Sequence, residues 1–159
     1  MAALPGDRAR FYDREYAGTE YAPSEHAEQH EALPLVRRFV QEHDLGGKKC
    51  LEVGCGRGAF QDLVDDYTGV DISREAGKHL HKPFHVASAT SLPFEDDSFE
   101  AAWTIWVFEH VADPEAGLRE LRRVLRPGGV LLFRPAWGCP PWAAQGYAVQ
   151  VLVDLLPRA

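Results

Sequence analysis

The amino-acid sequence predicts an α/β protein, a three-layer sandwich in which helices cover both faces of a mostly parallel sheet. From about Lys48 onward, short apolar or β-branched runs alternate with helix-like stretches, which is typical of βαβ units. The runs are nearly continuous in hydrophobicity, as expected for strands that are buried on both faces. The predicted strands are, in chain order, KKCLEV, YTGVDI, PFHVAS, EAAWTIWVF and GVLLFRP.

The clearest predicted helix runs from Pro114 to Leu125, where the leucines fall on one stripe that should pack against the sheet. Asp113 is placed to cap its first turn. Pro127-Gly128-Gly129 is expected to end the helix and to turn the chain back into a strand from Val130 to Arg134. The helix and this strand form the last predicted βαβ unit.

A second helical region is predicted ahead of the sheet. Ser24 can cap it, and apolar residues recur at helical spacing as far as about His43, with Pro34 marking a kink or a break. Further upstream, the stretch FYDREYAGTEY is aromatic and charged without a clear period. The sequence therefore predicts no regular element over that stretch.

The size and composition suit one globular domain, because 45% of the 159 residues are hydrophobic and 26% are charged. We expect three parts. Residues 1–45 form an N-terminal helical or lid segment, and residues 46–136 form the core. Residues 137–159 form a short C-terminal segment whose structure the sequence does not predict.

Charge and hydropathy exclude several classes of partner. A net charge of −7 opposes attraction to phosphate backbones and anionic lipid, so neither nucleic acid nor a membrane is an expected partner. No run approaches the ~18 apolar residues that span a bilayer, and the N-terminus lacks the apolar core of a secretory signal. We therefore expect a cytoplasmic location.

No metal or disulfide framework is expected. Cys50, Cys55 and Cys139 show no CxxC spacing, which argues against a cysteine-based zinc site. His26 and His30 have the spacing of ligands on one helix face, but no third ligand accompanies them. Surface positions are the more ordinary interpretation of these two histidines.

The segment LEVGCGRGAF, residues 51–60, carries the most informative pattern. A strand that ends at Val53 runs into the loop Gly54-Cys55-Gly56-Arg57-Gly58, where missing side chains let the backbone approach a ligand. Ala59 to Val64 can open a helix whose free N–H groups favour a phosphate or an amino-acid carboxylate. The loop therefore predicts a ligand held by main-chain groups.

Two cofactors satisfy this loop, because Gly54, Gly56 and Ala59 also match a looser dinucleotide fingerprint. Asp71 ends the second strand, where its carboxylate can accept ribose hydroxyls from either cofactor. Glu52 separates the two, because an acid beside the loop adds negative charge where NAD would place its pyrophosphate. S-adenosylmethionine carries an ammonium group and a sulfonium but no phosphate, so Glu52 favours it.

Taken together, these motifs resemble the class I methyltransferases, in particular the group that contains small-molecule and quinone-biosynthesis methyltransferases. The resemblance runs from about Lys49 to Pro135 and includes GVDIS, SLPFEDDSFEAAW, WVFEHVADPEAGLRELRRVLRPGG and GVLLF in the expected order. It implies a Rossmann-like fold with strand order 3-2-1-4-5. It also implies S-adenosylmethionine as cofactor, S-adenosylhomocysteine as product, and methyl transfer to oxygen, nitrogen or carbon of a small molecule.

The resemblance further implies where the cofactor binds. Glu52 and the glycine loop would line its methionine end, Asp71 would hold the ribose, and Ile72 would pack on the adenine. Ser88 stands where the family often has an acid that accepts from the adenine amino group. The backbone around the end of the fourth strand would meet the methionine amino group. The predicted cofactor-binding residues are Glu52, Gly54, Cys55, Gly56, Gly58, Asp71, Ile72, Ser88, Ala89, Thr104 and Ile105.

Methyl transfer depends on alignment and exclusion of water, and positioning can supply up to about 7–11 kcal/mol. His110, which follows the fourth strand, is the candidate base for an acceptor that must lose a proton, with a pocket-lining or capping role as the alternative. Glu109 is a secondary candidate. Four aromatic residues ahead of the core are expected either to fold over the cofactor as a lid or simply to pack: Phe11, Tyr12, Tyr16 and Tyr21.

The chain is short beyond the fifth predicted strand. Members of the resembled family continue with a helix and two more strands, whereas one apolar run, Ala148 to Leu156, follows here. We expect the sixth and seventh strands to be missing and the strand around Val130 to Phe133 to be a bare edge that pairs in a homodimer. A shortened chain and a module that binds the cofactor without methylating remain open, and an NAD-dependent oxidoreductase is the third functional alternative.

Overall fold

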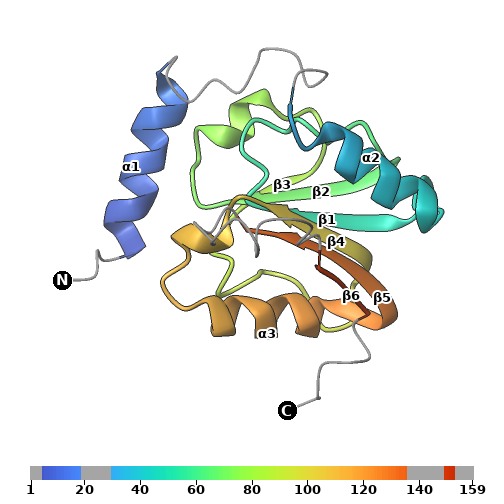
Figure 1. The fold of residues 1–159 in the computed structure, drawn as a ribbon. Coiled ribbons are helices and arrows are strands. Elements are labelled where there is room, and N and C mark those ends of the chain that lie inside the picture. Colours follow the sequence, from blue (N-terminus) through green and yellow to red (C-terminus); the bar gives the residue numbers. More distant parts are fainter. Residues whose placement is uncertain (1–4, 19–29, 136–148, 153–159) are drawn as a thin grey trace, which may run out of the picture.

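The computed structural model describes residues 5–18, 30–135 and 149–152. Its centre is a six-stranded sheet in the order β3-β2-β1-β4-β5-β6 (Figure 1). The first five strands run parallel, so the predicted order 3-2-1-4-5 is confirmed. The strands are β1 (Lys49–Val53), β2 (Asp66–Asp71), β3 (Phe84–Val86), β4 (Phe99–Ile105), β5 (Leu125–Arg134) and β6 (Val149–Leu152).

Two helices cover opposite faces of the sheet (Figure 1). Val36 on α2 packs in one core cluster with Trp103, and Leu121 on α3 packs in the other cluster with Leu51. All four side chains are fully buried. These two cores make the three-layer sandwich that the continuous apolar strands predict. The helices are α2 (Leu33–Glu42) and α3 (Pro114–Val124).

A further helix, α1 (Pro5–Ala17), lies beside the sheet over a stretch where the sequence predicted no regular element (Figure 1). The predicted helix before the sheet begins only at Leu33, because Pro34 occupies its first turn, where a proline lacks no needed donor. Pro34 therefore starts this helix and does not kink it. The predicted cap Ser24 and the lid residue Tyr21 lie outside the described residues.

The stretch after α3 differs from the prediction. Leu125 is already extended and pairs with Phe99, while Val130 pairs with Ala101, so residues 126–129 loop out from the ladder. Gly128, at a φ of +76°, forms part of this bulge. The Pro-Gly-Gly sequence therefore bulges a strand, whereas we expected it to end the helix.

The outer edge of β5 is paired in the structure. β6 runs antiparallel to it, with Val130 opposite Leu152 and Phe133 opposite Val149. The expectation of a missing sixth strand and a bare fifth strand was therefore wrong, because the apolar run near the C-terminus returns to this edge. The homodimer stays a prediction, but a bare β5 edge no longer supports it.

Within residues 5–18, 30–135 and 149–152, no helix combines the length and the apolar character that crossing a membrane requires.

The predicted cap of α3 is confirmed, because the Asp113 carboxylate accepts a hydrogen bond from the Ala116 N–H at 2.9 Å. We predict that Asp113→Ala lowers the free energy of unfolding by about 1 kcal/mol, since it removes the partner of that N–H group. Asp113→Asn, which keeps an accepting oxygen, should retain most of the stability. Urea denaturation measures both, and equal midpoints for Asp113→Ala and the parent protein would contradict the prediction.

Candidate functional site

A cavity of about 970 Å³ lies at the carboxyl ends of the parallel strands and is closed on one side by α1. This is where open α/β sheets bind ligands, and the volume is at the upper end of the usual range for small-molecule sites. Glycine-loop, strand-end and α1 side chains all reach it. The predicted cofactor-binding residues that line it are Glu52, Gly54, Cys55, Gly56, Gly58, Asp71, Ile72, Ser88, Ala89 and Ile105.

Thr104 is the predicted residue that does not line the cavity. It is 1% exposed, and its hydroxyl oxygen has no hydrogen-bond partner within the described part of the chain. Thr104 precedes the last residue of β4, and successive side chains of a strand point to opposite faces. Ile105, at the strand end, reaches the cavity instead.

The glycine loop is shaped by a close contact. Gly54 has a φ of +78°, and a Cβ atom there would lie 2.1 Å from a methyl carbon of Val107. The N–H groups of Gly54 and Cys55 both donate to the Val70 carbonyl, at 2.7 and 3.0 Å. Only glycine satisfies the conformation and the contact together at position 54. The loop is thus wedged between β2 and the segment that follows β4.

The helix predicted over Ala59–Val64 is absent, and the chain forms successive tight turns there. Gln61 donates to the Gly58 carbonyl and Leu63 to the Phe60 carbonyl. The reason is length, because residues 54–65 must hold both the glycine loop and the whole connection to β2. The dipole of a long helix therefore does not contribute to this site, and the loop's own N–H groups remain.

Asp71 connects the glycine loop to the loop after β2. One carboxylate oxygen accepts from the Gly56 N–H and the other from the Ser73 N–H, each at 2.9 Å. The side chain is 6% exposed. Burial raises the pKa of Asp71, and the backbone hydrogen bonds oppose this rise. The carboxylate is held rigidly at the cavity wall.

Glu52 lies in a buried polar group under the same loop. Its carboxyl accepts a hydrogen bond from the Tyr67 hydroxyl at 2.5 Å. Burial raises its pKa to about 8, against the opposing effect of that hydrogen bond. A neutral carboxyl is therefore favoured at neutral pH until a cation comes near, which would lower the pKa again.

The opposite end of the cavity is lined by Ile72 and Ser88-Ala89. The Ser88 hydroxyl lies 2.9 Å from the Thr90 hydroxyl and accepts from the Thr90 N–H at 3.2 Å. Ala89 is nearly buried and packs in the core beneath α3. This end presents an apolar surface with one serine.

Helix α1 brings Tyr12 and Tyr16 to the cavity wall, as the lid interpretation requires. Tyr16 stands over the glycine loop, since its hydroxyl lies 3.1 Å from the place of a Cβ on Gly56. Phe11 on the same helix is 42% exposed and does not line the cavity. Two of the three described lid aromatics therefore reach the site.

Three sets of hydrogen bonds hold α1 over the cavity. Arg57 donates to the Tyr16 and Gly18 carbonyls at 2.7 and 2.9 Å. Asp13 accepts from the Ser73 hydroxyl at 2.6 Å, a bond that lowers the pKa of Asp13. Near the other end, Arg8 donates to the His110 carbonyl. The helix is thereby tied to the glycine loop, to the loop after β2 and to η3.

His30 lies in the cavity wall, and the expected surface position was wrong. Its ring stacks on Trp106 with centroids 5.2 Å apart and meets the edge of Phe60 at 4.6 Å. Its Nδ1 accepts from the Ala32 N–H at 3.1 Å, and burial lowers the pKa of His30. The ring is neutral, with its proton on Nε2. His26 lies outside the described residues.

Trp106 has a φ of +56°, an unusual value for a residue other than glycine. Its N–H donates to the Arg134 carbonyl at 2.7 Å, which continues the ladder between β4 and β5. Such a conformation costs about 1–3 kcal/mol and persists where its surroundings enforce it. Here it directs the chain from the end of β4 into the cavity wall.

His110 belongs to η3 (Phe108–His110) and lines the cavity, but its side chain is 51% exposed. Glu109 beside it also lines the cavity and is 12% exposed. Among the described residues, no group of three or more acidic, cysteine or histidine side chains could hold a metal. The candidate base is thus a partly solvated histidine next to a more buried acid.

Sequence reasoning missed several residues of this cavity. Arg8, His30 and Val107 reach it from outside the glycine-loop motif, and Tyr67 holds the Glu52 carboxyl from below. Tyr67 opens the YTGVDI run, so its aromatic ring near a buried acid was a usable signal. Arg8 and His30 carry no local pattern that links them to the loop.

The order of the parallel strands, the glycine loop and the acid at the end of β2 define a cofactor-binding α/β domain. A methyltransferase domain family matches residues 51–133. The chain belongs to this family. The cofactor that the match indicates is S-adenosylmethionine, in agreement with the interpretation of Glu52 and Asp71.

Two curated relatives illustrate the match. The fatty-acid O-methyltransferase of Mycolicibacterium smegmatis is 29% identical over 127 residues, which cover 70% of this chain and 46% of that protein. The phthiotriol/phenolphthiotriol dimycocerosates methyltransferase of Mycobacterium tuberculosis is 35% identical over 129 residues, covering 70% and 47%. The chain spans about half the length of these curated relatives.

Solved structures support the fold. The YcgJ protein of Bacillus subtilis superposes with a TM-score of 0.59 at 28% identity, covering 65% of this chain and 50% of that one. The cyclase SpnF superposes with a TM-score of 0.66 at 24% identity, covering 83% and 60%. The second likeness shows the fold alone, because the two sequences are only 24% identical.

The contact at Gly54 predicts a strong effect of one added methyl group. Gly54→Ala places a Cβ 2.1 Å from Val107 at a positive φ, and we expect it to lower the free energy of unfolding by about 2–4 kcal/mol. Gly46→Ala is the control, because a Cβ at Gly46 meets nothing within 4 Å. Urea denaturation distinguishes them, and a Gly54→Ala protein as stable as the control would contradict the geometry.

The raised pKa of Glu52 predicts a pH dependence of stability. Between its ordinary value of 4.5 and about 8, the folded protein holds a proton that the unfolded chain releases. The free energy of unfolding therefore falls as pH rises through this window, by at most about 1.4 kcal/mol per pH unit from this group. Glu52→Gln should flatten that slope in urea titrations at several pH values. An unchanged slope would mean that Glu52 is ionised in the folded protein.

Proposed function

We propose that this chain binds S-adenosylmethionine in the cavity and transfers its methyl group to a small-molecule acceptor. The observation that carries the proposal is the pair of buried carboxyls, Glu52 and Asp71, on either side of the glycine loop. A pyrophosphate at that loop would gain nothing from Glu52, because its negative charge would keep that carboxyl protonated. A ligand with an ammonium group and a ribose makes use of both.

The chain's own residues would each contribute binding or exclusion of water. Glu52 would accept from the ammonium group, and the approach of that cation opposes the burial that raises its pKa. Asp71 would accept from the ribose hydroxyls. Ile72 and Ala89 would enclose the adenine, with Ser88 as its polar partner. When bound, the cofactor supplies an electrophilic methyl group on a sulfonium.

Helix α1 would serve as the cover of this site. Tyr12 and Tyr16 line the cavity, and Arg57 and Asp13 fasten the helix to the loops on either side of the ribose position. Exclusion of water by such a cover favours methyl transfer, because positive charge disperses as the methyl group leaves sulfur. The small-molecule acceptor, the cytoplasmic location and the homodimer remain predictions.

Calorimetry with S-adenosylhomocysteine and with NAD tests the proposal. We predict binding of the first and no binding of the second, and Asp71→Asn should weaken S-adenosylhomocysteine at least tenfold, about 1.4 kcal/mol, since it removes a charged acceptor. Asp66→Asn is the matched control, because Asp66 is exposed at the opposite end of the same strand. It should bind as the parent protein does.

The outcomes separate the functional classes. Binding of NAD alone would overturn the proposal in favour of an oxidoreductase. Binding of S-adenosylhomocysteine together with failure to methylate a broad panel of acceptors would instead favour a module that binds the cofactor without turnover.

A further inference from the structure

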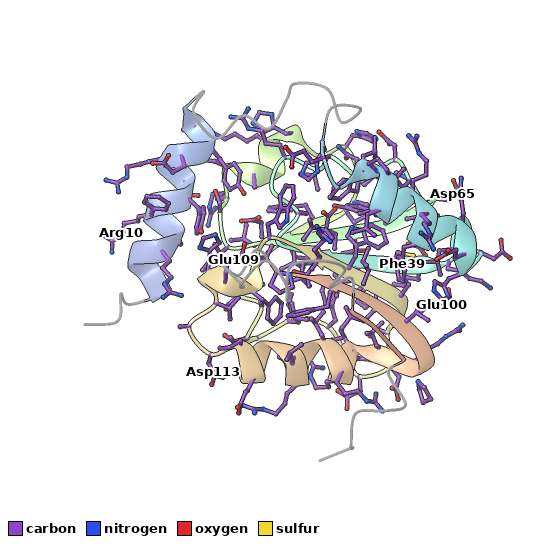
Figure 2. All side chains as sticks on the ribbon, in the orientation of Figure 1. Arg10, Phe39, Asp65, Glu100, Glu109 and Asp113 are labelled. Carbon is purple, nitrogen blue, oxygen red and sulfur yellow. The ribbon has the colours of Figure 1, made fainter. Side chains whose placement is uncertain are left out.

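Glu109 lines the cavity, but the contacts proposed for S-adenosylmethionine give it no role. It lies on η3, directly after the chain leaves β4 through Trp106, and it lines the cavity. In the view of Figure 2, its label lies between α1 and the sheet. Its backbone neighbour His110 is fixed to α1 by the bond from Arg8. The acid is thus held at the side of the cavity where α1 covers it.

The Glu109 carboxyl can accept a further hydrogen bond. Among the residues that the structure describes, its buried Oε2 has no hydrogen-bond partner, and its Oε1 comes no nearer than 3.9 Å to the His110 Nε2. The Glu109 side chain is 12% exposed, whereas that of His110 is 51% exposed. A buried acceptor without a partner is rare in folded proteins and costs about 1–3 kcal/mol. Of the two neighbours, Glu109 is the one that a bound molecule would satisfy.

The hydrogen-bonding groups of S-adenosylmethionine already have acceptors in this cavity. In the proposed function, Glu52 takes the ammonium group, Asp71 takes the ribose hydroxyls and Ser88 faces the adenine amino group. Glu109 is a fourth acceptor in the same cavity. The remaining source of a hydrogen-bond donor is the molecule that receives the methyl group.

We propose that Glu109 is a catalytic residue that accepts a hydrogen bond from a hydroxyl or amino group of the methyl acceptor and then receives its proton. This inference rests on the proposed function. The acceptor's oxygen or nitrogen forms a bond to the methyl carbon, and the carbon–sulfur bond breaks with its electron pair on sulfur. The oxygen–hydrogen or nitrogen–hydrogen bond breaks, and its proton moves to the Glu109 carboxylate. His110, half exposed beside it, gives that proton a route to solvent.

The same geometry excludes one class of acceptor. A carboxylate acceptor would place a second negative charge against a buried acid without offering a donor, which is doubly unfavourable. The proposed substrate class is therefore an alcohol, a phenol or an amine. Fatty-acid methylation, which the name of one relative describes, would not suit this cavity.

A first experiment asks whether Glu109 serves the cofactor. The affinity for S-adenosylhomocysteine is measured by calorimetry in the parent protein, Glu109→Gln and Glu115→Gln. Glu115 is the matched control, an acid on α3 with an 84% exposed side chain. We expect the three affinities to agree within about twofold. A tenfold loss in Glu109→Gln alone would assign Glu109 to the cofactor and overturn the inference.

A second experiment uses probes of equal length in protein saturated with S-adenosylhomocysteine. We expect octylamine to bind at least about tenfold more tightly than octanoate, and Glu109→Gln to reduce this preference to less than about threefold. Glu115→Gln should keep the full preference. Equal binding of the two probes, no octylamine binding, or an unchanged preference in Glu109→Gln would overturn the inference.

The two experiments also distinguish this inference from the function on which it rests. If the parent protein fails to bind S-adenosylhomocysteine, the proposed function fails and the inference fails with it. If it binds S-adenosylhomocysteine but shows no amine preference, the inference alone fails.

Discussion

The carboxylate of Asp71 is the contact on which the site depends, because it fixes two loops at once. Its oxygens accept from Gly56 in the glycine loop and from Ser73 in the loop after β2. Ser73 in turn donates to Asp13 on α1. A chain of hydrogen bonds therefore runs from the glycine loop through Asp71 to the helix that covers the cavity. Each link orders the next, so the glycine loop and the cover are built together.

Burial raises the pKa of both acids of the site, but their hydrogen-bond partners differ. Asp71 accepts from two backbone N–H groups, which oppose the rise of its pKa on burial. Glu52 has one hydroxyl partner and a pKa raised to about 8, so it lies close to neutral pH without a cation nearby. A cationic ligand therefore gains an attractive charge interaction with the Glu52 carboxylate, which a neutral or anionic ligand cannot make. In the proposed function, Glu52 gives the loop its selectivity, since the glycines and Asp71 suit either cofactor.

The sequence predicted the parts of the fold that depend on local patterns. Continuous apolar strands and the capped, striped helix at Pro114 gave the layers and the parallel order, and the glycine loop with Asp71 gave the ligand position. The sequence did not predict the elements whose structure depends on the length of a connection or on pairing between distant segments. The turns that replace a helix over Ala59–Val64 follow from the short connection between β1 and β2. The strand β6 pairs with β5, and the apolar run that contains it does not show from sequence which strand it will join.

The residues of the site likewise fall into those that the sequence predicted and those that depend on the fold. The residues predicted to contact the cofactor fall within or immediately beside the family match at residues 51–133, because a shared ligand imposes a shared pattern. Arg8, Tyr12 and His30 come from before it, and their place in the wall follows from how the N-terminal segment folds back. Sequence favoured His110 over Glu109 as the base because His110 follows the fourth strand, at the end of the sheet where ligands bind. Glu109 is proposed instead because it is the more buried of the two, and burial at this position depends on the whole fold around η3.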